Sequence, residues 1–167
     1  MHPNEQLLNK LFQLLNAHDH NGMAECYDEQ AHFEDIAFRL DNKAKIHAMW
    51  DMICSKDENE KTTRITAEVK ELSANDSIGH AVVEESYIFR ETDRLVQNKI
   101  ASTFEFRDGL IYKQNDKCDP VRWADQAFGG INGFFAGHVG FLRRLKAMYK
   151  LKKARPKAFK VFPESRP

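Results

Sequence analysis

Cysteine is scarce in this chain of 167 residues, which contains only Cys26, Cys54 and Cys118. The three are far apart and odd in number, which argues against a disulfide framework and against a closely spaced metal site. We therefore expect reduced structural thiols. The seven histidines show no recognisable ligand spacing either, so we expect no bound metal ion.

Long hydrophobic runs are missing as well. The longest uncharged stretch, residues 126–142, contains five glycines. It is too short and too polar for a membrane-spanning helix, which needs about 20 apolar residues. The first eight residues show no basic segment before an apolar one, so we expect no secretory signal peptide and a cytoplasmic protein.

The motifs of nucleotide and serine chemistry are also absent. The glycines between residues 129 and 140 lack the Lys-Ser/Thr pair of a P-loop and the βαβ setting of a dinucleotide site. No Gly-x-Ser-x-Gly elbow occurs. We therefore expect no bound cofactor.

The chain has no net charge, because 25 basic residues balance 25 acidic ones. The balance hides two unlike parts. Residues 126–167 contain ten Lys/Arg and one acidic residue, whereas residues 1–125 contain 15 against 24. With twelve Phe, four Tyr and two Trp, the chain is too apolar to be disordered. We predict one acidic domain over residues 1–128 and a Gly/Phe-rich, then basic, extension over 129–167.

Helical spacing of apolar residues predicts three helices in the first third of the chain. They cover Asn4–Ala17, Met23–Glu29 and Lys43–Lys56, the last capped by Asp41 or Asn42. Residues 31–40 between them are typical of a strand.

From residue 64 the apolar period changes from 3.6 to 2. The runs 64–72, 80–90, 95–107 and 110–116 predict an antiparallel meander with turns between them. Helices followed by adjacent strands indicate an α+β domain, in which a curved sheet packs its concave face onto the helices.

Asp35 is the first candidate for chemistry. Alternation along residues 31–40 places it on the face of Phe33, with His32 and Glu34 on the other face. If that face is interior, burial raises the pKa of the carboxyl and suits it to act as an acid or base. The alternative is that Asp35 caps a turn or pairs with an arginine.

Asp116 and Asp119 form the second candidate, because two carboxyls three residues apart can point into one cavity, here beside Trp123. The alternative for Asp119 is a cap on the segment that leads to Trp123.

The facing of Asp116 depends on a hairpin. In a two-residue turn at Asp108-Gly109, Ser102 opposes Asn115 and Asp116 lies on the other face. A one-residue bulge reverses that assignment. The sequence leaves both registers open.

Glu85 is a polar member of an alternating apolar face, and so are Asn98 and Ser102 on the next predicted strand. A few polar groups in an apolar wall are what a small-molecule pocket needs to orient its ligand. The alternative is that the opposite face, with Val82 and Ile88, is buried and Glu85 is solvated.

The extension ends in a predicted basic amphipathic helix. It packs on its own domain or on a dimer mate in the first interpretation, and contacts an anionic membrane surface through residues 134–155 in the second. Non-specific nucleic-acid binding comes last and is not expected. The apolar face of this predicted helix contains Phe134, His138, Phe141, Leu142, Leu145, Met148 and Tyr149.

Together these features resemble the SnoaL-like branch of the nuclear transport factor 2-like superfamily, which includes ketosteroid isomerases, limonene-epoxide hydrolases and scytalone dehydratase. The resemblance covers about residues 5–129, and its strongest motif is Phe-Glu-Phe-Arg-Asp-Gly-Leu-Ile from Phe104 to Ile111. Gln114 stands where the family usually has His, and Lys117-Cys118 where it has an aromatic-rich pair. The other matching positions are Tyr27-Asp28, Phe33-Glu34-Asp35, Ala48-Met49-Trp50, Tyr87-Ile88-Phe89, Asp116, Asp119, Trp123 and Gln126-Ala127-Phe128-Gly129.

The resemblance implies a cone-shaped, cystatin-like α+β fold, in which a strongly curved, mostly antiparallel sheet wraps around a long N-terminal helix and two further helices. It also implies an apolar cavity open at one end, and a homodimer formed through the outer face of the sheet. Related folds host isomerases, polyketide cyclases, hydrolases, dehydratases and plain binding proteins, so the reaction class stays open.

Three hypotheses follow. The first is a cofactor-independent acid/base enzyme for an apolar carbonyl- or epoxide-bearing molecule, in which Asp116 or Asp35 moves a proton and Tyr27, Tyr87 or Asn98 stabilises an oxyanion. The second is a non-catalytic protein that binds a lipid-like ligand in the same cavity, and the third is a membrane-surface protein held by its tail. The candidate catalytic residues are Asp35, Asp116 and Asp119, and the candidate substrate-binding residues are Tyr27, Phe33, Trp50, Glu85, Tyr87, Asn98, Ser102, Phe104 and Trp123.

Overall fold

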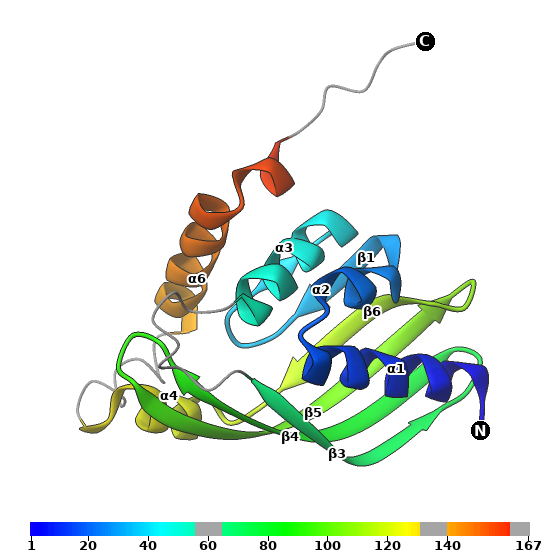
Figure 1. Cartoon of the computed structure of the whole chain (residues 1–167), viewed down its shortest axis with the longest axis horizontal. Coiled ribbons are helices and arrows are strands. Elements are labelled where there is room, and N and C mark those ends of the chain that lie inside the picture. Colours follow the sequence, from blue (N-terminus) through cyan, green and yellow to red (C-terminus); the bar gives the residue numbers. More distant parts are fainter. Residues whose placement is uncertain (56–64, 131–139, 161–167) are drawn as a thin grey trace.

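A six-stranded sheet with helices over one of its faces forms the body of the molecule (Figure 1). The computed structural model describes residues 1–55, 65–130 and 140–160. The expected α+β class is confirmed. The remaining segments include 131–139, so the first residues of the predicted tail helix, from Phe134, lie outside the described residues.

The first helix, α1, spans Pro3–Ala17 and begins at a capping box. The His2 ring accepts the backbone N–H of Asn4 at 3.1 Å, and the Glu5 carboxylate accepts that of His2 at 3.0 Å. The apolar stripe of α1 lies across the concave face of the sheet, where Leu8 and Leu11 are fully buried. The helix predicted over residues 4–17 is therefore present.

The second helix, α2, spans His20–Glu25, which is earlier and shorter than the predicted Met23–Glu29. The reason is local, because the Asp19 carboxylate accepts the N–H of Gly22 at 2.9 Å and starts the helix there. The chain is already extended at Tyr27, which begins β1. The third helix, α3, spans Lys43–Cys54 and is capped by Asn42, one of its two predicted caps.

The strands are ordered β2-β1-β6-β5-β4-β3. β1 and β6 run parallel, and every other neighbouring pair is antiparallel. The meander predicted from residue 64 onward is thus present, and β1 and β2 extend it on the β6 side. The bounds are β1 Tyr27–Glu34, β2 Arg39–Leu40, β3 Thr66–Ala74, β4 Ile78–Phe89, β5 Arg94–Arg107 and β6 Leu110–Lys117.

The single strand predicted over residues 31–40 is wrong. β1 ends at Glu34, and the chain turns at Asp35, whose Oδ1 accepts the backbone N–H groups of Ala37, at 2.7 Å, and of Phe38. A side chain that mimics a turn in this way breaks the extended run. β2 then pairs back onto β1.

Within the described residues, three elements follow the sheet. Helix α4, Pro120–Phe128, packs on β5, and helix α6, Gly140–Ala154, stands beside α3 before the short 3₁₀ helix η1, Pro156–Phe159 (Figure 1). Leu151 of α6 is fully buried and belongs to the main core. No helix in residues 1–55, 65–130 or 140–160 is long and apolar enough to cross a membrane.

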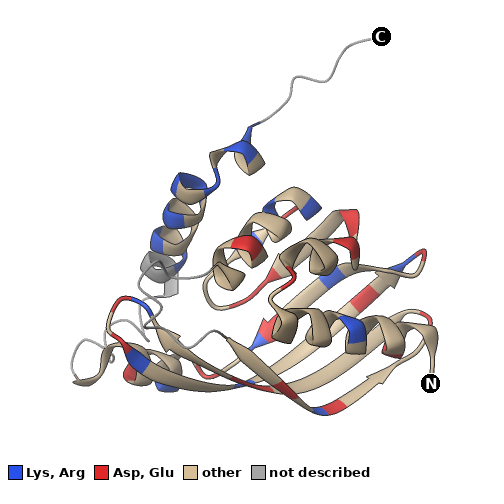
Figure 2. Cartoon of the chain, in the orientation of Figure 1, with Lys and Arg blue, Asp and Glu red and all other residues tan. Residues whose placement is uncertain are grey.

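Three basic side chains of α6, and Arg155 just after it, form ion pairs with acidic groups of the body. Figure 2 shows where the basic and acidic residues lie along the ribbon. The described part of the extension, residues 140–160, thus packs on the body of the same chain, in line with the intramolecular form of the first interpretation. Arg144 pairs with Glu34 at 2.8 Å, and Arg155 pairs with Asp51. Lys146, at 2.9 Å, and Lys150 both pair with Glu91.

Candidate active site

The inward face of β4 carries two of the predicted site residues. Ala81 and Val83 are buried in the core, and Glu85 and Tyr87 continue the same alternation. Glu84, between Val83 and Glu85 in the sequence, is exposed on the opposite face. Glu85 therefore points toward the concave side of the sheet, and the alternative in which it is on the solvent face does not hold.

The neighbouring strand adds two polar groups to this wall. Asn98 and Ser102 of β5 are buried and share the face of Phe104. Asn98 lies directly opposite Glu85 across the β4–β5 pair. Both residues thus occupy the few polar positions of an otherwise apolar surface, as a ligand site requires.

A bulge decides where Asp116 points. β6 has one extra residue, Tyr112, relative to β5, so that Phe106 opposes Ile111 but Ser102 opposes Asp116. The register without a bulge is therefore wrong, and the bulged alternative is confirmed. It turns Asp116 to the inward face, beside the polar residues of β5.

Asp116 is half-buried, and burial raises the pKa of its carboxyl to about 7. The negative charge of Asp35 adds to that rise, whereas hydrogen bonds from Ser102 and Gln114 oppose it. Gln114 Nε2 lies 2.9 and 3.1 Å from the two carboxyl oxygens of Asp116. Near neutral pH Asp116 is therefore present in both protonation states, which suits a general base.

Glu85 has a different environment. Burial raises the pKa of its carboxyl to about 8, and the negative charges of Asp116 and Asp35 add to the rise. Within the described part of the chain, no donor hydrogen-bonds to it. The residue as a whole is half-buried. Glu85 is thus mostly protonated at neutral pH.

Asp35 contributes charge from the turn between β1 and β2. Its Oδ1 is committed to the turn, as the capping alternative predicts. Its carboxylate nevertheless lies near enough to raise the pKa values of Glu85 and Asp116. The structure therefore brings the three carboxyls to one end of the sheet, where β1, β4 and β6 end.

Two tyrosine–tryptophan pairs flank these carboxyls. Trp50 Nε1 donates to the Tyr27 hydroxyl at 3.3 Å, and Trp123 Nε1 donates to the Tyr87 hydroxyl at 2.8 Å. Burial raises the pKa of both tyrosines, so their hydroxyls stay protonated. Both phenolic O–H groups are thus hydrogen-bond donors; Tyr27 donates to Gln114, and no acceptor for Tyr87 lies within the described residues.

Aromatic rings form the apolar part of the surroundings. Phe33 meets Trp50 edge to face with ring centroids 5.9 Å apart, and Phe89 meets Trp123 in the same way at 5.7 Å. Phe104 is fully buried on β5. Burial is the largest cause of the raised pKa values of Glu85 and Asp116.

Asp119 lies outside the cluster. It is exposed and caps α4, because its Oδ1 accepts the N–H groups of Val121 at 2.9 Å and Arg122 at 3.1 Å. Gln114 is the residue that the sequence analysis does not include in the site. Its position in the sequence could have identified it, because it lies two residues before Asp116 on the same strand and so shares the face of Asp116.

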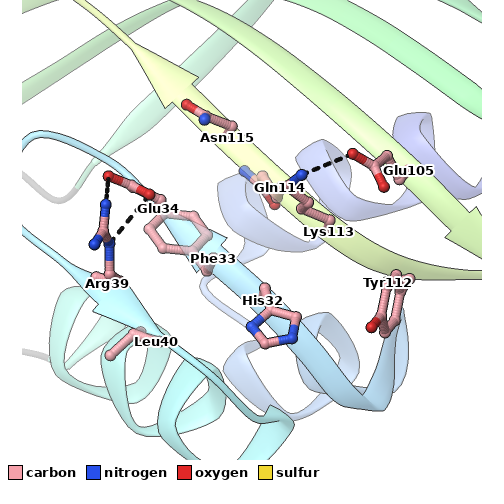
Figure 3. A pocket seen from close by; sticks show the side chains of 10 residues that line it. All are labelled: His32, Phe33, Glu34, Arg39, Leu40, Glu105, Tyr112, Lys113, Gln114 and Asn115. Atoms are coloured by element: carbon pink, nitrogen blue, oxygen red, sulfur yellow. Dashed lines mark hydrogen bonds and ion pairs between the residues drawn. The ribbon is translucent and has the colours of Figure 1, made fainter.

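A separate groove of about 400 Å³ lies between β1, β2 and β6 (Figure 3). Its rim is polar, and its charges are paired within it, Arg39 with Glu34 at 2.8 Å and Lys113 with Glu105 at 2.9 Å. Its residues are His32, Phe33, Glu34, Arg39, Leu40, Glu105, Tyr112, Lys113, Gln114 and Asn115.

No group of three or more His, Cys, Asp or Glu side chains within the described ranges is arranged to hold a metal ion.

Comparison with known proteins gives one family and many similar folds. The SnoaL-like domain family matches residues 8–114. An LEH-like epoxide hydrolase from M. tuberculosis is 14% identical, with a TM-score of 0.59 over 89% of this chain and 96% of that one. No curated protein sequence matches the chain.

Two further solved structures are similar. The epoxide hydrolase/cyclase-like enzyme SalBIII, studied for pyran ring formation in the polyether salinomycin, is 15% identical, with a TM-score of 0.59 over 70% of this chain and 91% of that one. A protein with a ketosteroid isomerase-like fold from Catenulispora acidiphila is 7% identical, with a TM-score of 0.61 over 72% and 91%. Identities this low carry the fold alone.

Proposed function

This chain belongs to the SnoaL-like domain family, and we propose that it is a cofactor-independent acid/base enzyme that binds an apolar small molecule bearing a carbonyl or epoxide group. The observation that carries the proposal is the pair Asp116 and Glu85, two inward-facing carboxyls whose pKa values burial raises to about 7 and about 8. Two carboxyls whose environments give them different pKa values can serve as base and acid.

Asp116 is the base of the proposed reaction. Two donors, Ser102 and Gln114, favour its ionised form, so it accepts a proton from water or from a carbon next to a carbonyl group. Glu85 is the acid and gives its proton to the substrate oxygen. One proton enters Asp116 and one leaves Glu85, so the total charge of the pair is unchanged.

Tyr87 is the donor that best fits a developing oxyanion. It accepts from Trp123, and within the described ranges its own O–H proton has no acceptor. The Tyr27 proton, by contrast, is already donated to Gln114. Asp35 acts through its charge, because its Oδ1 is held by the turn.

Two observations support the substrate class. Tyr27 and Tyr87, whose pKa values the charges of Asp116 and Glu85 raise further, accept hydrogen bonds from Trp50 and Trp123. These two indoles pack edge to face on Phe33 and Phe89, and such aromatic surroundings favour an apolar molecule. Proteins of similar fold include an LEH-like epoxide hydrolase and an epoxide hydrolase/cyclase-like enzyme, and both descriptions are compatible with acid/base chemistry.

The test is turnover of a panel of apolar epoxides and of ketones with an acidic α-hydrogen, followed by chromatography and mass spectrometry. We expect at least one substrate to react, and Asp116→Asn and Glu85→Gln each to lower kcat/KM by about 10²–10⁴-fold. Glu84→Gln is the matched control, because Glu84 is the exposed neighbour on the opposite face of β4. It should leave turnover unchanged.

Two outcomes contradict this proposal. Binding of panel compounds without turnover favours the non-catalytic alternative, a carrier of a lipid-like ligand. Turnover that survives both Asp116→Asn and Glu85→Gln places the chemistry elsewhere.

A further inference from the structure

Three side chains behind Asp116 form a hydrogen-bonded chain whose direction its first member fixes. The Trp50 indole N–H can only donate, and it donates to the Tyr27 hydroxyl oxygen. The single Tyr27 proton then goes to Gln114 Oε1, 2.5 Å away. The Gln114 amide is thereby held with its nitrogen on the other side.

That nitrogen faces Asp116. Gln114 Nε2 donates to both carboxyl oxygens, at 2.9 and 3.1 Å. An ionised carboxylate accepts at both oxygens, whereas a protonated one uses one oxygen as a donor. Gln114 is only 2% exposed, so its amide is held among protein groups. The fixed amide therefore favours the charged form of Asp116.

Other groups around Asp116 act in the opposite sense. Asp35 in the β1–β2 turn and Glu85 on β4 carry negative charge when ionised. Tyr27 on β1 is kept neutral by burial, which raises its pKa. Ser102 on β5 is the second donor to the carboxyl. Gln114 thus supplies one of two contacts that counter burial and like charge.

We propose that Gln114 is a positioning residue, oriented by the Trp50–Tyr27 pair, that favours the ionised form of Asp116 and so sets it as the base rather than the acid. The inference rests on the proposed function for its catalytic meaning. Its physical content, the protonation state of Asp116, is measurable without a substrate.

The test is a titration of the full-length protein labelled with ¹³C at the aspartate and glutamate side-chain carboxyls, with Asp116→Asn and Glu85→Gln to assign the signals. In Gln114→Met the Asp116 pKa should rise by about 1 unit, because a donor to a charged group is lost. The Glu85 pKa should fall slightly, because its neighbour is then more often neutral. A merely structural role moves neither pKa.

Gln126→Met is the matched control. Gln126 also makes two amide hydrogen bonds, to the backbone of Gln97 at 2.7 and 3.1 Å, away from the carboxyls. Its loss should leave both titrations unchanged. An unchanged Asp116 pKa in folded Gln114→Met overturns the proposal.

Tyr27→Phe carries the test if Gln114→Met does not fold. It removes the proton that orients the amide, so the Asp116 pKa should rise in the same direction by a smaller amount. An unchanged or lower pKa overturns the proposal. If the titrations move as expected but no panel substrate reacts, the proposed function fails alone. If substrates react while the titrations do not move, only the role of Gln114 fails.

Discussion

Glu85 occupies a position at which its own charge is unfavourable. Burial and two neighbouring carboxylates raise its pKa from the ordinary 4.5 to about 8. The folded chain therefore retains a proton that the unfolded chain loses. The stability that the folded chain has with Glu85 protonated is fully present below about pH 4.5. It is lost as the pH rises through about 8 and the buried side chain ionises. A residue kept at such a cost has a use that stability does not explain.

Replacing Glu85 therefore has a pH-dependent effect on stability. Glu85→Gln should match the natural chain at pH 3.5, below the ordinary pKa of 4.5, where Glu85 is neutral in both the folded and the unfolded chain. At pH 9 it should be more stable by about 1–2 kcal/mol, which is roughly 3–8 °C in Tm for this chain length. Thermal melts at both pH values check this, with Glu84→Gln as control. An equal difference at the two pH values contradicts it.

The rate of the proposed reaction has a pH dependence of its own. Because Asp116 must be ionised and Glu85 protonated, kcat/KM should follow a bell with apparent pKa values of the pair near 7 and 8. In Glu85→Gln the alkaline limb should disappear from the residual rate. A profile that is flat from pH 6 to 9 contradicts the assignment of acid and base.

At the scale of the elements, the sequence predicts most of the strands but not the facing of every site residue. Alternation along β4 and β5 brings Glu85 and Asn98 into the predicted site, because period 2 is strict within a strand. It cannot place Asp116, because the extra residue Tyr112 comes from strand pairing and no local pattern marks it. At Asp35 the local pattern itself misleads. Residues 31–40 alternate as one strand would, but the turn at Asp35 ends β1.

The contact between α1 and the sheet depends on one glycine. A Cβ at Gly79 would lie 2.9 Å from Leu8 Cδ1 and 2.9 Å from Phe106 Cζ. Gly79→Val should therefore cost about 1–3 kcal/mol in the free energy of unfolding, by overpacking this contact. Urea unfolding measures the loss. His80→Val, on the exposed face of the same strand, should change stability by less than about 0.5 kcal/mol. Similar losses in both variants contradict the close approach.

At the scale of the whole molecule, the zero net charge describes an acidic body and a basic helix held against it. Arg144 bonds the Glu34 carboxylate at 2.8 Å and the Asp35 carbonyl oxygen at 3.0 Å. Helix α6 is thus anchored next to the turn that carries Asp35. Composition predicts two charged segments, but only the packed structure shows what each one contacts. The homodimer and the membrane contact through residues 134–155 stay predictions.

Docking of α6 has a direct energetic test. Leu151 is fully buried, whereas Leu145 on the same helix is 51% exposed. Leu151→Ala should lower the free energy of unfolding by about 2–4 kcal/mol. Leu145→Ala, the matched control, should change it by less than about 0.5 kcal/mol. Denaturant unfolding compares the two, and equal effects mean that α6 is not docked in solution.

The central claim is that two inward-facing carboxyls titrate near neutral pH in opposite roles. Carboxyl ¹³C titration of the unmodified protein tests it most directly, with Asp116→Asn and Glu85→Gln to assign the two signals. The structure predicts midpoints near 7 for Asp116 and near 8 for Glu85. Midpoints for both at the ordinary values of about 4 would contradict it.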